Sequence, residues 1–166
     1  MNTNIGYVTR QVNYFFGKQG HEFALVFAES TVIVTDRTQL RMVDRPDFVG
    51  LVSKAPATRW GGLVPRVEGD GASYITDHPS IEAAADAVRA EASALRAEAD
   101  RAATDPVYAL ERALKNHDWT SWASDDHRVW SAGERAAKQI EELRAKVAPE
   151  VYDALVAKYN PNHEGK

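Results

Sequence analysis

The sequence predicts an α+β fold, in which an N-terminal antiparallel β-sheet is followed by a C-terminal bundle of about four helices. Short runs rich in β-branched and aromatic residues, separated by turn signals, fill residues 1–77. Asp77-His78-Pro79 is a cap-and-proline signal, after which helical periodicity continues over residues 79–159. Because no flexible linker separates the two parts, residues 1–159 are predicted as a single domain. Residues 160–166 are predicted as a disordered tail.

The β part opens with an ambiguous stretch and then a hairpin. Residues 5–16 combine helical spacing with a strand-like composition, and helix is slightly favoured. Glu22–Ala28 and Thr31–Thr35 are β-rich runs separated by two residues, which is hairpin spacing. The run FALVF is apolar on both faces. We therefore expect this hairpin to be central in its sheet or covered by a helix.

The rest of the β part is predicted to alternate strands with turns. Lys54–Gly62 is predicted as a loop, because it contains Pro56 and Gly61-Gly62. The last two strands flank residues 68–71, whose two glycines suit a turn with positive φ. The predicted strands are Gln39–Val43, Phe48–Ser53, Leu63–Val67 and Ala72–Thr76.

The first predicted helix, residues 80–103, has a heptad seam composed mainly of alanine. Small seam residues let another helix approach closely, so packing within the same chain is favoured. A homodimer through the 81–102 seam is the alternative. The seam residues are Ile81, Ala85, Val88, Ala92, Leu95, Ala99 and Ala102.

Three further helices are predicted. Asp105-Pro106 repeats the cap-and-proline device and starts a helix of about three turns. A longer helix covers about Asp125–Val147, and Pro149 opens a last one that ends near Tyr159.

The segment Asp118–Trp130 joins two of these helices and contains three of the four tryptophans. Ser124 followed by two aspartates is typical of a helix start, so capping and core anchoring are the favoured interpretation. The alternative is a site, because several acid/base or ligand groups fall within eleven residues. They are His117, Asp118, Asp125, Asp126 and His127.

Composition excludes several functional classes. The 166-residue chain has no cysteine, which excludes disulfides, zinc-thiolate sites and a cysteine nucleophile. It has no apolar run of membrane-spanning length and no leader-like amino terminus, so a cytoplasmic protein without membrane association is expected. The GxSxG, HExxH and GxxxxGK[ST] motifs are absent, and we assign no catalytic residue, metal or cofactor.

The favoured hypothesis is a non-enzymatic protein-interaction module. A small bacterial or phage accessory protein, inhibiting a host or defence complex by binding to it, would have this kind of sequence. Arginines beside aromatic residues suit interface hot spots. The predicted partner-binding residues are Arg59, Trp60, Arg128 and Trp130.

Two alternatives stay open. Arginines of the β part beside Trp60 would suit nucleic-acid binding, although Asp36, Asp44 and Asp47 interleave with them. These arginines are Arg37, Arg41, Arg45 and Arg66.

The second alternative is a metal-dependent phosphohydrolase. The order of His78, then His117-Asp118, then Asp126 or Asp153 resembles the H…HD…D arrangement of HD-type phosphohydrolases. That resemblance implies a divalent metal that activates water, with His117, Asp118 and Asp126 as the site residues. The sequence departs from the family at Trp119 and Thr120, where an apolar helix would continue.

Overall fold

The computed structural model describes residues 8–12, 21–54, 59–67, 71–117 and 127–160, and side chains are not described for 127–133. A five-stranded antiparallel sheet in the N-terminal half is followed by helices, which confirms the predicted α+β fold. The chain divides into two compact units, residues 1–99 and 100–166. Each is described by itself, and the single domain over 1–159 stays a prediction. None of the described helices could cross a membrane.

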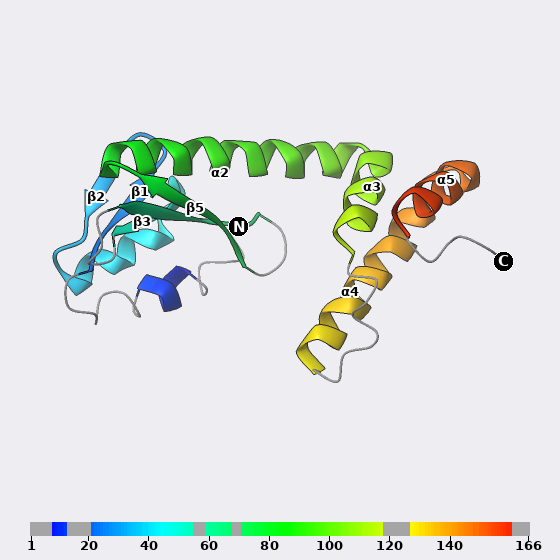
Figure 1. Cartoon of the computed structure of the whole chain (residues 1–166), viewed down its shortest axis with the longest axis horizontal. Helices are drawn as coiled ribbons and strands as arrows, with labels where there is room; N and C mark the ends of the chain where they lie inside the picture. Colours follow the sequence, from blue (N-terminus) through cyan, green and yellow to red (C-terminus); the bar gives the residue numbers. More distant parts are fainter. Residues whose placement is uncertain (1–7, 13–20, 55–58, 68–70, 118–126, 161–166) are drawn as a thin grey trace. The chain divides into compact units, whose positions relative to one another are not determined.

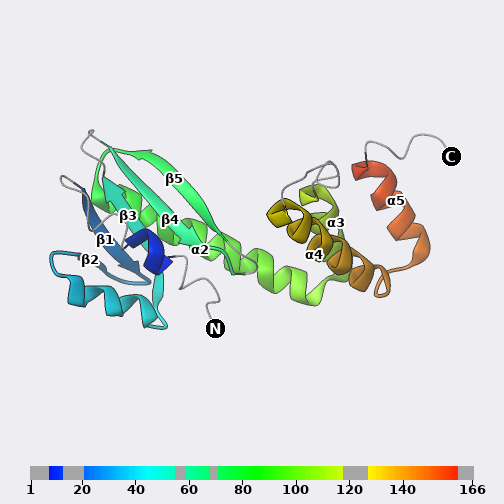
Figure 2. The same cartoon turned by 90° about the horizontal axis from the view of Figure 1, so that it is seen from below.

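The sheet belongs to the first unit and has the strand order β2-β1-β3-β4-β5, with every neighbouring pair antiparallel (Figures 1 and 2). The predicted hairpins are confirmed: β1 pairs with β2, and β4 pairs with β5. The strands are β1 (Glu22–Phe27), β2 (Thr31–Ile33), β3 (Phe48–Lys54), β4 (Trp60–Pro65) and β5 (Ala72–His78).

Both faces of the sheet are covered, which explains the apolar run in β1. On one face Ala24 and Val26 pack with residues of the long helix α2 (Ile81–Thr104). On the opposite face Phe23, Leu25 and Phe27 pack with Val8 and Val12 of a helical segment at residues 8–12, and with Val43. Figure 1 shows α2 on one side of the sheet and the helical segment on the other. The second of the two expected arrangements is confirmed: β1 is covered on both faces, whereas the hairpin is not central, because β2 is an edge strand.

Two glycines let α2 lie unusually close to the sheet. A Cβ atom on Gly62 would lie 2.5 Å from Val88 Cγ2, and one on Gly50 would lie 2.7 Å from Val88 Cγ1. Carbon atoms normally stay about 3.5–4.0 Å apart. The Val88 side chain therefore occupies the space that a side chain at position 50 or 62 would need. Val88 is fully buried there.

The strand predicted at Gln39–Val43 is wrong. Residues Arg37–Asp44 form a 3-10 helix, η1, with Asp36 as its N-cap. The Asp36 carboxylate accepts from the Thr38 N–H at 2.7 Å, and Gln39 Oε1 accepts from the Asp36 N–H at 2.9 Å. This reciprocal capping box satisfies the free donors of the first turn, and it overrides the strand-like composition.

Two predicted boundaries also need correction. The loop predicted over Lys54–Gly62 is partly strand, because β3 ends at Lys54 and β4 begins at Trp60. Gly61 and Gly62 are therefore sheet residues. The helix after β5 is capped by Ser80 instead of Asp77 or His78: Ser80 Oγ accepts from the Ala83 N–H at 3.2 Å.

The alanine seam of α2 faces the sheet of its own chain. Ala85 and Val88 are buried, and Ile81, Ala92 and Leu95 pack partly buried against the same cluster. The partner of the seam is thus a sheet, whereas the sequence favoured a helix. From Ile81 to Leu95 the sheet thus occupies the surface that a homodimer seam would use, and the homodimer alternative stays a prediction.

The second unit contains α3 (Pro106–Asn116), α4 (His127–Arg144) and α5 (Pro149–Tyr159). Leu110, Leu114 and Ile140 form its buried centre. The Asp105 cap of α3 is confirmed, since its carboxylate accepts from the Tyr108 N–H at 3.0 Å. The predicted tail lies outside the described residues except for Asn160, which caps the end of α5.

Candidate functional site

A cleft of about 670 Å³ opens in the first unit, between α2 and one end of the sheet. Antiparallel pairing places the ends of β1 and β4 and the start of β3 at that end. The lining residues come from segments distant in sequence: Ala28, Val43, Asp44, Arg45, Pro46, Phe48, Val49, Val64, Pro65, Val67, Arg89, Ala92, Ser93 and Arg96.

Most of the lining is apolar, and part of it is continuous with the hydrophobic core. Val64 belongs to the buried cluster beneath α2, and Val49 and Ala92 pack partly buried against that cluster. Phe48 and Val43 belong to the cluster on the opposite face of the sheet. A side chain entering the cleft would therefore meet a rigid apolar surface, because its walls are held by core packing.

Arg45 borders the cleft on the η1 side. Its Nε donates to Asp47 Oδ1 at 2.9 Å and its Nη2 donates to Asp47 Oδ2 at 2.7 Å. The guanidinium carbon also lies 4.5 Å from the centroid of the Phe27 ring. This bidentate ion pair and the ring contact fix the orientation of the guanidinium.

Arg89 borders the cleft on the α2 side and ties the helix to the first hairpin. Its Nε donates to the Phe27 carbonyl oxygen at 3.0 Å and its Nη2 donates to Thr31 Oγ1 at 2.7 Å. Its Nη1 donates to Asp86 Oδ1 at 2.8 Å. These three bonds leave two of its five N–H groups for a ligand.

Arg96 completes the basic rim. It lies on α2 two turns after Arg89, is exposed, and has no ion pair among the residues that the structure describes. The lining as a whole has three arginines against one carboxylate, Asp44. The carboxylates of Asp47 and Asp86 lie outside the lining and offset two of these charges.

The chemistry of the cleft suits binding. Within the described part of the chain, the lining has no histidine, and Ser93 is its only hydroxyl side chain. No group of three potential metal ligands is present among the described residues. Fixed guanidinium groups above an apolar floor favour a ligand that carries both an anionic and an apolar group.

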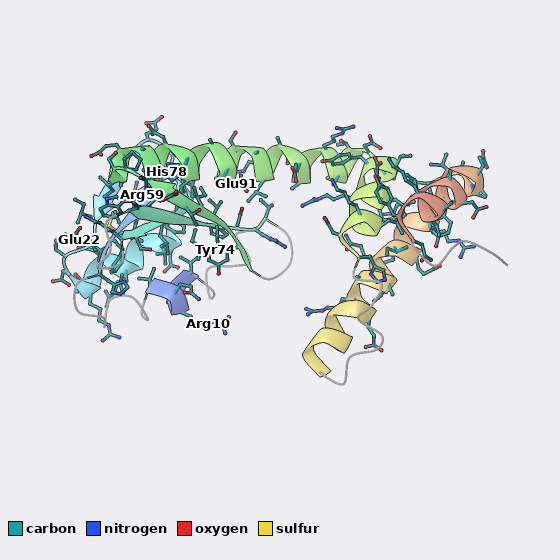
Figure 3. The ribbon with its side chains drawn as sticks, in the orientation of Figure 1. Arg10, Glu22, Arg59, Tyr74, His78 and Glu91 are labelled. Carbon is teal, nitrogen blue, oxygen red and sulfur yellow. The ribbon has the colours of Figure 1, made fainter. Side chains whose placement is uncertain are left out.

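The predicted partner-binding residues Arg59 and Trp60 lie elsewhere, where β4 begins beside the end of β5. Arg59 Nη2 donates to the Asp77 carbonyl oxygen at 2.7 Å, and its Nε lies 2.7 Å from Asp77 Oδ1. Figure 3 shows Arg59 beside His78. Asp77 has φ of 77°, a left-handed conformation that costs a non-glycine residue about 1–3 kcal/mol. Arg59 therefore stabilises a strained residue near the end of β5, which gives it a structural role.

Trp60 is half-buried and packs against the cluster beneath α2, with Lys54 Nζ 6.0 Å from the centroid of its ring. Much of its surface thus belongs to the core. The side chains of Arg128 and Trp130, the other predicted partner-binding residues, lie outside the described ones. The assignment of all four residues to a partner interface stays a prediction.

The arginines of the nucleic-acid hypothesis come from η1, from its C-terminal end and from the end of β4. Arg37 and Arg41 lie exposed on η1, and Arg66 is exposed after the end of β4. Only Arg45 lines the cleft.

The residues of the phosphohydrolase hypothesis fall in different parts of the chain. His78 ends β5 in the first unit, whereas His117 caps α3 and Asp153 lies on α5 in the second. Asp118 and Asp126 lie outside the described residues. The structure offers this hypothesis no assembled metal site among the residues it describes.

Arg89, Ser93 and Arg96 were not predicted from the sequence as binding residues. All three lie on the helix predicted over 80–103, at positions off its apolar seam, where polar side chains are ordinary surface residues. The signal that distinguishes Arg89 is tertiary, because its hydrogen bonds reach residues 58 and 62 positions away in the sequence.

No protein-family model, curated protein or solved structure matches the chain.

Proposed function

We propose that this protein is a protein-interaction module that holds an acidic segment of a partner protein in the arginine-lined cleft. The observation that carries the proposal is the combination of three guanidinium groups with an apolar floor in one cleft. An accessory protein that inhibits a larger complex would act through such a surface.

The separation of charged rim and apolar floor in the cleft supports a peptide segment as the ligand. A carboxylate of the partner would bind the remaining donors of Arg45, Arg89 and Arg96, and a neighbouring apolar side chain would pack on Val49, Val64 and Ala92. Buried apolar contact supplies affinity, and charged groups at the rim supply orientation and association rate.

Duplex nucleic acid fits this geometry less well. A backbone of phosphates needs a basic track that extends along the surface. Here Asp44 lies in the lining, and Asp47 is paired with Arg45. The nucleic-acid hypothesis is therefore retained as the second candidate, to be separated from the first by the experiment below.

The test compares two tryptophan variants at neighbouring positions of α2. Ser93 is exposed and lines the cleft, so Ser93→Trp fills it. Ala94 is also exposed on the same helix but is not in the lining, so Ala94→Trp is the matched control. Each tagged protein is used to capture partners from a nuclease-treated lysate of the organism of origin, and any captured protein is then purified for direct titration.

We expect a captured protein to bind the wild type and Ala94→Trp equally, and to bind Ser93→Trp at least about tenfold more weakly, a loss of about 1.4 kcal/mol. Arg96→Glu should weaken the same complex and reduce its salt dependence. Equal binding by both tryptophan variants would overturn the assignment of the cleft. Capture that disappears with nuclease treatment would favour nucleic acid instead.

A further inference from the structure

The charged residues that line the cleft differ in whether they already have partners. Arg45 and Arg89 are each held in an ion pair with a carboxylate of the same chain. The side chains of Asp44 and Arg96, in contrast, have no ion pair or hydrogen bond among the residues that the structure describes, and both are exposed. The cleft thus presents one uncompensated negative charge and one uncompensated positive charge to a ligand.

Asp44 and Arg96 belong to elements that pack on opposite faces of the sheet. Asp44 ends η1, whose Val43 packs in the cluster on the face that α2 does not cover. Arg96 lies on α2, which covers the other face through residues such as Ala92 and Leu95. The start of β3 and the end of β4 lie between these elements and contribute apolar residues to the lining. Core packing therefore keeps the two charges on separate walls of the cleft.

We infer that the segment bound in the cleft carries a basic residue as well as an acidic one, with an apolar residue between them, an inference that rests on the proposed function. The acidic residue pairs with the Arg96 guanidinium, and the basic residue pairs with the Asp44 carboxylate. The apolar side chain between them packs on the floor that Val49, Val64 and Ala92 provide.

Asp44 is the residue that makes this selection. Among the lining residues that the structure describes, it is the only carboxylate. The neighbouring Arg45 does not neutralise it, because Arg45 Nε and Nη2 donate to the Asp47 carboxylate at 2.9 and 2.7 Å. A segment whose charged residues were all acidic would set a like charge against Asp44, which is unfavourable. Asp44 thus disfavours a second acidic residue on its own wall and favours a basic one.

The test is a selection of displayed short random peptides on the full-length protein, with Asp44→Asn and Arg96→Gln selected in parallel. We expect the wild type to enrich peptides in which a basic and an acidic residue flank an apolar one. Asp44→Asn should lose the enrichment of the basic residue, and Arg96→Gln should reduce that of the acidic residue. Glu82→Gln and Arg41→Gln are matched controls, because both residues are exposed and lie outside the lining. Both controls should select the same peptides as the wild type.

A selected peptide, synthesised with blocked ends, is then titrated against the same proteins. Replacing its basic residue with glutamine should weaken binding to the wild type by about fivefold, which corresponds to about 1 kcal/mol for an exposed ion pair. The same replacement should change binding to Asp44→Asn by less than about twofold, because both changes remove one ion pair. Asp44→Lys should reverse the preference, so that a glutamate replaces the basic residue of the peptide. A variant that failed to fold could not produce this reversal.

The outcomes for the inference and for the proposed function differ. Enriched peptides with an acidic residue and no basic one overturn the inference and leave the proposed function in place. A basic residue that contributes equally to binding the wild type and Asp44→Asn has the same consequence. Selected peptides that bind Ser93→Trp as tightly as the wild type, or a selection that enriches no peptide, overturn the proposed function and the inference with it.

Discussion

The close approach of Val88 to the two sheet glycines leads to a quantitative prediction. Gly62→Ala adds a methyl group 2.5 Å from Val88 Cγ2, about 1 Å inside a normal carbon contact. Valine has few rotamers in a helix and Val88 is fully buried, so the side chain has little room to move away. Overpacking of this kind costs about 1–3 kcal/mol, and we expect Gly62→Ala to lower the free energy of unfolding by about 2 kcal/mol.

A double-mutant cycle shows whether this contact is the cause. Val88→Ala alone removes two methyl groups and leaves a cavity, at a cost of about 2 kcal/mol. In the double variant the added methyl at Gly62 enters the space that Val88 Cγ2 leaves, so the two costs should partly cancel. We expect the double variant to be about 1–2 kcal/mol more stable than the sum of the single changes predicts.

Gly50 provides the matched control. Its Cβ would also meet Val88, at 2.7 Å, but the nearest atom is the Leu63 carbonyl oxygen at 2.5 Å, which is backbone of the neighbouring strand. Val88→Ala should therefore rescue Gly62→Ala and leave Gly50→Ala strongly destabilised. Urea unfolding followed by circular dichroism measures all variants at one chain concentration. Additive costs in the Gly62 cycle, within about 0.5 kcal/mol, would refute the packing of α2 on these glycines.

Two smaller predictions concern polar contacts. Lys158 and Tyr159 donate to the Glu111 carboxylate and hold its pKa below the usual value. The resulting stability is present above the pKa of the unfolded state and is lost as the pH falls through the folded-state pKa. Glu111→Gln should therefore flatten the acid side of a melting-temperature profile, and an unchanged profile would contradict this role. Gln39→Ala removes the side-chain acceptor of the η1 capping box and should lower the free energy of unfolding by about 1 kcal/mol. Gln39→Glu keeps an acceptor and should be nearly neutral in urea unfolding. Equal losses of stability in the two variants would exclude the capping box as the cause.

Local signals accounted for most of the fold. The first hairpin, the cap at Asp105 and the helix opened by Pro149 all depend on residues within a few positions of each other, and all three were predicted. Helical spacing also favoured a helix in residues 5–16, and residues 8–12 are helical with Val8 and Val12 buried.

The errors occurred where one local signal competed with another or with tertiary packing. The residues around Gln39 predicted a strand, yet the Gln39 side chain accepts a hydrogen bond from the Asp36 backbone N–H and caps a helix. Gly61 and Gly62 were interpreted as loop because glycine is rare inside strands. Glycine is needed at both positions because neighbouring elements lie close to them. A Cβ on Gly61 would lie 3.1 Å from the Ile75 carbonyl oxygen of β5, and one on Gly62 would lie 2.5 Å from Val88 Cγ2 of α2. A sequence does not reveal which helix will lie against which strand.

The residues of the cleft also depend on tertiary packing that the sequence does not reveal. Arg45 was selected for its charge and neighbours, and it does line the cleft. Arg89 and Arg96 have the spacing of ordinary surface residues on a helix, and they become part of a site only when α2 lies over the end of the sheet. Binding residues that come from separate elements have no common spacing along the chain, so a search for motifs cannot find them.

Pro65 illustrates how much one residue determines once the register is known. It contributes an apolar surface to the cleft, and its missing N–H fixes the hydrogen-bonding phase of β4 and β5. That phase directs the backbone of Tyr74 outward. From the sequence alone Pro65 only marks a weak strand, because the consequence depends on its pairing with Ala72.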